Sequence, residues 1–173
     1  MPTKPHTRRL CLQRAIVLPL AAVLHPAQAA PAKPQVEVWK DPNCGCCEDW
    51  VSHLQKSGFA VRAFNDGNTA ARKRLGIPDA LGSCHTGSVS GYALEGHVPA
   101  KDVQRLLREK PQAIGLAVPG MPVGSPGMDG AIYQGRKDPF DVLLVLPGGG
   151  TRVFQSYAKG DAMDASHLKR SRF

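Results

Sequence analysis

Residues 35–51 have the sequence QVEVWKDPNCGCCEDWV. Its first four residues alternate between polar and apolar side chains before Trp39, which is typical of a strand with one buried face. Pro42 interrupts the strand, and Glu48 and Asp49 then precede apolar residues at helical spacing. Acidic side chains are favoured in the first turn of a helix by its dipole. This stretch therefore predicts a strand, a turn and a helix that ends near Gly58.

The pattern on either side of this stretch predicts an α/β protein. Further elements are expected in the order strand, helix, strand, strand, helix, at residues 60–64, 69–75, 85–89, 92–95 and from Pro99 onward. The resulting order β-α-β-α-β-β-α, with a cysteine motif after the first strand, matches a thioredoxin-like layout. Residues 111–139 are rich in glycine and proline and predict a long ordered loop. Strands at 142–146 and 152–157 predict an added C-terminal β-hairpin that extends or covers the domain.

The N-terminal residues predict export. The chain has 173 residues and a formal charge of +8, and residues 1–29 contain basic side chains without an acidic one. An apolar middle and Ala27-Gln28-Ala29 follow this basic start, which is the pattern of a signal peptide. Arg8-Arg9 also resembles a twin-arginine signal, so the Sec and twin-arginine routes both stay open.

A retained membrane anchor is the alternative to cleavage, but the apolar span is short and contains Arg14. We therefore expect a signal peptide at 1–29, no stable membrane anchor after its cleavage, and a single domain at 30–173 with its core at about 35–157. The charge left after cleavage is too small to indicate a nucleic-acid partner.

The cysteines of the expected mature chain are concentrated at one place. Three of them lie within Cys44-Gly45-Cys46-Cys47, and the fourth is Cys84. Disulfides are the default in an exported protein, but adjacent cysteines bond only through a strained ring, and Cys84 cannot pair with all three. The cluster lies where the predicted turn meets the helix, where free backbone N–H groups and the helix dipole stabilise thiolates. Crowded thiolates indicate metal binding or redox chemistry.

Two histidines lie close to predicted strand ends. His85 adjoins Cys84, and His97 directly precedes the helix that begins near Pro99. Because neighbouring strand residues point to opposite faces, Cys84 and His85 share a site only where the chain is irregular. Glu95, also at a strand end, is expected to be an ordinary surface carboxylate.

Two methionines, Met121 and Met128, lie seven positions apart in the loop rich in glycine and proline. Filling gaps in the core is the usual role of methionine. Ligation of Cu(I) by the thioether is the functional alternative, because soft neutral donors suit that ion.

Four blocks of sequence occur in an order that resembles the CopG-type copper-resistance family, the exported metal-binding proteins and not the ribbon-helix-helix repressors of the same name. They are KDPNCGCC at 40–47, SCHT at 83–86, EGHVPA at 95–100 and GMPVGSPGM at 120–128. The resemblance spans residues 36–157. It implies a periplasmic protein linked to copper tolerance, with a thioredoxin-like fold and a Cys-x-Cys-Cys motif that holds copper, a multinuclear cluster being one arrangement. The implied ligands are Cys44, Cys46, Cys47 and Cys84 and, with weaker support, His85, His97, Met121 and Met128.

The donor chemistry favours Cu(I) over other ions. Thiolates with thioethers and imidazoles nearby form a soft donor set. Zinc is the main rival, but its four-cysteine sites usually use two separated pairs. Three crowded thiols point poorly at one ion, whereas bridging thiolates shared among several Cu(I) ions relieve the crowding. The thiols of the metal-free protein must stay reduced, or the site closes as a disulfide.

Two functions follow from this pattern. The first is a copper-binding protein that sequesters, delivers or redox-converts copper, with copper ions and other periplasmic copper-handling proteins as partners. On this interpretation the chain is a metal-binding protein, and copper redox conversion is its one candidate enzymatic activity. The alternative is a thiol–disulfide oxidoreductase that uses Cys44 and Cys47, which form a C-x-x-C pair. Cys46 would interfere with clean two-electron cycling in such an enzyme.

Overall fold

The computed structural model describes Met1 and residues 32–157. Apart from Met1, the expected signal peptide at 1–29 lies outside the described residues, as do residues 158–173. The proposed domain limits therefore stay predictions. In the part of the chain that is described, no helix combines the length and apolar character that crossing a bilayer requires.

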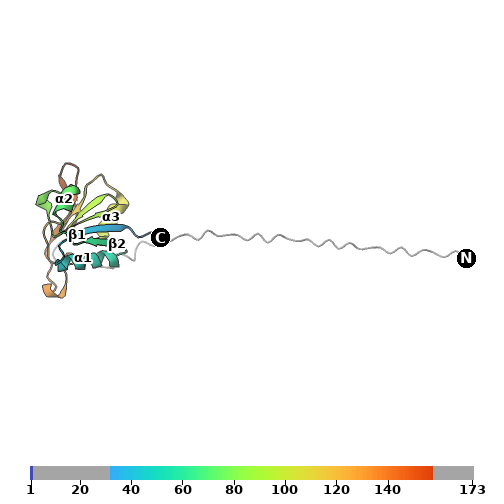
Figure 1. Ribbon diagram of the computed structural model, residues 1–173, viewed down its shortest axis with the longest axis horizontal. Coiled ribbons are helices and arrows are strands. Elements are labelled where there is room, and N and C mark those ends of the chain that lie inside the picture. The colour runs from blue at the N-terminus through green and yellow to red at the C-terminus, as the bar shows by residue number, and fades with distance from the viewer. Residues whose placement is uncertain (2–31, 158–173) are drawn as a thin grey trace. The chain divides into compact units, whose positions relative to one another are not determined.

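Residues 32–157 form a mixed α/β fold around a seven-stranded sheet with the strand order β2-β1-β3-β4-β5-β6-β7. The pairs β1–β2 and β4–β5 are parallel, and the other neighbouring strands are antiparallel. Figure 1 shows α1 running alongside β1 and β2. The bounds are β1 Gln35–Lys40, α1 Gly45–Lys56, β2 Ala60–Phe64, α2 Thr69–Arg74, β3 His85–Val89, β4 Tyr92–Glu95, α3 Ala100–Glu109, β5 Gly115–Ala117, β6 Phe140–Val145 and β7 Thr151–Tyr157, with short 3-10 helices at Asp79–Leu81 and Ala131–Tyr133.

The predicted α/β class and the order β-α-β-α-β-β-α of the first elements are confirmed. The prediction of a long loop at 111–139 is wrong in one respect, because this segment contains the strand β5. This strand pairs with β4 on one side and β6 on the other. The C-terminal hairpin β6–β7 therefore extends the main sheet through β5 and does not cover it. A specific relation to the thioredoxin topology stays a prediction.

The two faces of the sheet pack against different helices. On one face, β1, α1 and α3 contribute Val38, Trp50 and Leu106 to the larger core cluster. Neighbouring strand residues point to opposite faces, so Leu94 belongs to this cluster and Ala93 to a smaller one on the other face. Leu75, directly after α2, packs against the smaller cluster. The sheet therefore separates α1 and α3 from α2.

One buried polar contact joins α3 to the last strand. The hydroxyl of Tyr157 donates a hydrogen bond to Oδ2 of Asp102, and both side chains are buried. Burial raises the pKa of both groups. Tyr157 ends β7, the edge strand furthest along the sheet from β1. The pair therefore joins α3 to the strand that is furthest from β1 in the order of the sheet.

Candidate metal centre

The sheet register brings the four cysteines of the described residues together, beside the end of β1 and the start of β3. Cys44 is the N-cap of α1, and Cys46 and Cys47 lie in its first turn. Cys84 directly precedes β3, which pairs with β1 so that Lys40 lies opposite His85. The turn after β1 and the residue before β3 therefore meet. The four sulfur atoms lie within 4.8 Å of one another.

The cluster is in a partly oxidised state. Cys44 and Cys47 form a disulfide, while Cys46 and Cys84 are free thiols. The sulfur of Cys46 lies 3.5 Å from that of Cys44 and 3.9 Å from that of Cys84. Cys46 is therefore the thiol that links the disulfide to Cys84. This disulfide is the state expected when the thiols of the metal-free protein are oxidised.

His85 and His97 converge on the sulfur of Cys84. Nδ1 of His85 lies 3.3 Å from this sulfur, and Nε2 of His97 lies 3.1 Å from it. The second ring nitrogen of each histidine lies 2.8 Å from a backbone carbonyl oxygen, that of Gly96 for His85 and that of Pro126 for His97. Since a carbonyl only accepts, these nitrogens carry the hydrogens, and in the neutral rings the nitrogens that face Cys84 carry lone pairs. Histidine ligands of metals are commonly oriented in this way.

Burial favours the neutral form of both imidazoles. His85 and His97 are fully buried. Loss of water lowers the pKa of His85 well below its usual value, and the charges of His97 and Lys40 lower it further. Burial also lowers the pKa of His97, against the hydrogen bond to Pro126 and the nearby carboxylate of Asp129. Neutral imidazoles with free lone pairs are the form that binds metals.

Cys84 and His85 can share one site because the chain at Cys84 is not part of a regular strand, as the sequence analysis required. Cys84 lies outside β3, so strand alternation does not separate its side chain from that of His85. His85 faces α1, with its ring centroid 4.2 Å from that of Trp50. The residues Cys84, His85 and His97 thus form a second group of donor atoms within 4.8 Å of one another, joined to the first through Cys84.

The thiol of Cys84 has a raised pKa. Burial raises the pKa of the Cys84 thiol to about 12, and the neighbouring Cys46 raises it as well, while the hydroxyl of Ser83 acts in the opposite direction. The metal-free protein therefore holds Cys84 as a thiol. Ligation through this sulfur releases a proton, as thiol ligation generally does.

A buried cation lies at the end of β1. Lys40 is fully buried, and its Nζ lies 2.6 Å from a carboxylate oxygen of Glu48, which is in the first turn of α1. Its backbone carbonyl accepts a hydrogen bond from Gly67. This ion pair joins the end of β1 to the first turn of α1, the two elements on either side of the turn that carries the cysteine motif. Nothing in the sequence pattern indicates that Lys40 is buried.

The loop that carries the two methionines contacts the site through its backbone, and the thioethers of Met121 and Met128 do not make this contact. Pro126 accepts the hydrogen bond of His97. Met128 is almost buried, and its sulfur accepts a hydrogen bond from Tyr133 at 3.3 Å, whereas 53 % of Met121 is exposed. The thioether of Met128 therefore has a partner outside the cysteine and histidine groups. Ligation by either methionine stays a prediction.

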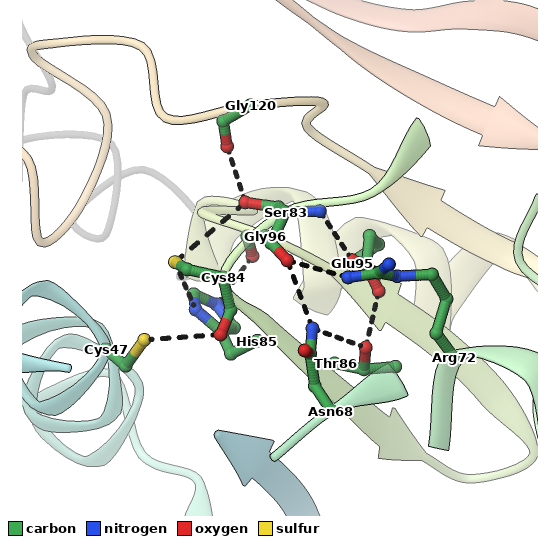
Figure 2. A network of polar contacts seen from close by, with 10 residues as sticks. All are labelled: Cys47, Asn68, Arg72, Ser83, Cys84, His85, Thr86, Glu95, Gly96 and Gly120. Atoms are coloured by element: carbon green, nitrogen blue, oxygen red, sulfur yellow. Dashed lines mark hydrogen bonds and ion pairs between the residues drawn. The ribbon is translucent and has the colours of Figure 1, made fainter. Parts of the chain in front are cut away.

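The prediction that Glu95 carries an ordinary surface carboxylate is wrong. Glu95 is fully buried and forms an ion pair of 2.9 Å with Nε of Arg72. Both groups belong to a polar network that Figure 2 shows around Ser83, the residue before Cys84. Local periodicity does not reveal this pairing, because Arg72 and Glu95 lie on separate elements, α2 and β4. The signal available in the sequence is the position of Glu95 two residues before His97.

Comparison with known proteins supports the sequence resemblance. A family model described as a protein of unknown function, DUF411, matches residues 81–128. Two solved structures, form 1 and form 2 of a copper resistance protein named CopG, also match. Each is 44% identical to this chain with a TM-score of 0.67; the form 2 match covers 72% of this chain and 98% of its own, the form 1 match 73% and 99%. A search of curated proteins gives no match.

Proposed function

The chain belongs to the CopG-type family of copper resistance proteins, and on that premise we propose that it binds Cu(I) through the thiolates of Cys44, Cys46, Cys47 and Cys84. The observation that carries the proposal is the approach of all four sulfurs to within 4.8 Å of one another. Soft sulfur donors select Cu(I) over hard cations. We further propose that the protein is exported to the periplasm and that copper is its cargo.

The histidines complete the proposed site. His85 and His97 direct ring nitrogens at the sulfur of Cys84, at 3.3 and 3.1 Å. Imidazole is a borderline donor that accepts both Cu(I) and Cu(II). This mixed donor set supports sequestration, delivery or redox conversion of copper. Met121 and Met128 are candidate additional ligands that a movement of their loop would have to bring in.

The crowding of the sulfurs supports more than one copper ion. The first turn of α1 supplies Cys46 and Cys47, and the N-cap supplies Cys44. Three sulfurs on one helical turn, with Cys84 facing them, point poorly at a single tetrahedral ion. Thiolates that each bridge two Cu(I) ions remove this conflict, because Cu(I) accepts two or three sulfur ligands. We therefore propose a multinuclear Cu(I) cluster.

Copper loading tests the proposal directly. The fully reduced chain, loaded anaerobically with Cu(I) and freed of excess metal, is expected to retain more than one copper per protein. The form with the Cys44–Cys47 disulfide is expected to retain less, because two of the four sulfurs are then bonded to each other. Elemental analysis gives the ratio, and X-ray absorption gives the sulfur and nitrogen ligation. A ratio of one or less in the reduced chain contradicts the cluster.

Thiol–disulfide exchange is the second candidate function. The disulfide joins the N-cap of α1 to its first turn, in C-x-x-C spacing. Thiolates at a helix N-terminus are good attacking and leaving groups in exchange reactions. Under this function the reduced, metal-free chain should accelerate the reduction of insulin by dithiothreitol. Under the copper-binding function alone, the rate should equal that of the uncatalysed reaction.

A further inference from the structure

A polar network on the face of the sheet that packs against α2 holds the peptide group that joins Ser83 to Cys84. The network residues Asn68, Arg72, Thr86 and Glu95 come from the start of α2, from α2, from β3 and from β4. Thr86 follows His85 in β3, so the two side chains point to opposite faces. Figure 2 shows Ser83 between Cys84 and the Arg72–Glu95 pair.

Both backbone polar groups of Ser83 are bound by this network. Its N–H donates to Oε1 of Glu95 at 2.7 Å, and its carbonyl accepts from Nη2 of Arg72 at 2.7 Å. Arg72 also donates through Nε to the same carboxylate oxygen at 2.9 Å. Arg72, Glu95 and the backbone of Ser83 therefore close a ring of three hydrogen bonds.

Two further side chains hold this ring in place. The hydroxyl of Thr86 donates to Oε2 of Glu95 at 2.6 Å. Asn68 donates through Nδ2 to the carbonyl of Ser83 at 3.1 Å and to the hydroxyl oxygen of Thr86 at 3.2 Å. The carbonyl of Ser83 belongs to the peptide bond that joins it to Cys84. The orientation of this peptide group therefore determines the position of Cys84 where the chain enters β3, and with it how the sulfur of Cys84 meets that of Cys46.

We propose that Arg72 and Glu95 are positioning residues of the copper site, which act through the Ser83–Cys84 peptide. This inference rests on the proposed Cu(I) binding. A fully buried carboxylate is costly unless it is paired and hydrogen-bonded, and an apolar pair of similar size often gives equal or greater stability. The bonds of this ion pair to Ser83 give it a role that an apolar pair could not fill, since leucine or methionine cannot hold a peptide group by hydrogen bonds.

Arg72→Met tests the proposal in the reduced full chain. The change removes the bonds from Arg72 to Glu95 and to Ser83 and keeps an unbranched side chain. Cu(I) affinity, measured by competition with a chromophoric Cu(I) chelator, is expected to fall about 10- to 100-fold, the range found for residues that orient metal ligands. X-ray absorption of the loaded variant is expected to show less sulfur around copper, because Cys84 no longer meets the other thiolates.

Tyr157→Phe is the matched control for stability. It removes the buried hydrogen bond between Asp102 in α3 and the end of β7, the strand furthest from β1 in the order of the sheet. We expect it to lower the melting temperature of the metal-free protein while Cu(I) affinity stays at the wild-type value. A wild-type affinity in Arg72→Met overturns the inference, and so does an equal loss of affinity in both variants, since that loss would come from stability alone.

Asn68→Ala decides the case if Arg72→Met does not fold. It removes hydrogen bonds to Ser83 and Thr86 without leaving a charge unpaired, and the same loss of affinity is expected at the lower end of the range. Wild-type affinity in this variant overturns the inference. A wild-type chain that takes up no Cu(I) instead overturns the proposed function, and the inference fails with it.

Discussion

Replacing Cys46 by serine is expected to lower the Cu(I) affinity of the reduced chain by more than about 100-fold, beyond the loss typical of residues that only orient a ligand. The sulfur of Cys46 lies 3.5 Å from that of Cys44 and 3.9 Å from that of Cys84, so it is the thiolate that connects the others. A hydroxyl group is nearly the same size, but its hard oxygen is a poor ligand for Cu(I). Competition with a chromophoric Cu(I) chelator measures the loss.

The same variant separates the two candidate functions. Cys46 is a free thiol of intermediate exposure, and Cys44 and Cys47 keep their disulfide without it. A thiol–disulfide oxidoreductase would therefore retain its activity in Cys46→Ser, and its cycling would become cleaner. Copper binding through a shared cluster would be lost. Near-wild-type copper affinity in Cys46→Ser would exclude Cys46 as a central bridging ligand and would favour the exchange reaction.

Thermal unfolding of the metal-free Cys46→Ser protein is the necessary control. The melting temperature should stay close to that of the reduced wild-type chain, because the side chain of Cys46 is not part of the core clusters of the described residues. A large fall in stability would mean that the loss of copper reflects a damaged turn at the start of α1.

The strand, turn and helix that carry the cysteine motif follow from local sequence because short-range effects determine them. Alternation predicts β1, Pro42 interrupts the pattern, and Glu48 stabilises the first turn of α1. Once β1 pairs with β3, Cys84 lies beside the motif. The grouping of Cys84 with the three clustered cysteines is implied by the family resemblance, and in the fold it depends on the pairing of β1 with β3.

Other features of the site depend on long-range pairing that periodicity does not encode. The strand β5 has only three residues, one of them Gly115, and forms because β4 and β6 lie on either side of it. Glu95 is buried because Arg72 from α2 reaches it across the face of the sheet. The ring orientations of His85 and His97 depend on two backbone carbonyls that come from other loops. Each of these outcomes needs the tertiary structure.

Replacing Gly127 by alanine is expected to cost about 3 kcal/mol of folding stability, a large value for one methyl group. Gly127 has a φ of +86°, a conformation that costs an L-residue roughly 1–2 kcal/mol. The added Cβ would also lie 2.5 Å from the carbonyl oxygen of Cys46 and 2.9 Å from the backbone nitrogen of Trp50. Backbone atoms in the first turns of α1 cannot move aside as a flexible side chain can, so the loop must withdraw from the helix.

That withdrawal should also weaken copper binding. Pro126, the residue before Gly127, accepts the hydrogen bond that orients His97 toward Cys84. A displaced loop removes this acceptor, and the expected loss of Cu(I) affinity is about 10-fold, as for other groups that orient a histidine ligand. Chemical denaturation of the metal-free protein measures the stability, and chelator competition measures the affinity.

Gly135→Ala is the matched control for backbone strain. Gly135 has a similar φ of +74°, but a Cβ at this position would meet nothing within 4 Å. It should therefore show the cost of the left-handed conformation alone, roughly 1–2 kcal/mol, with unchanged copper affinity. Equal losses of stability in the two variants would show that contact between the loop and α1 contributes nothing. The hydrogen bond from His97 to Pro126 would then be the support that residues 120–128 give to the site.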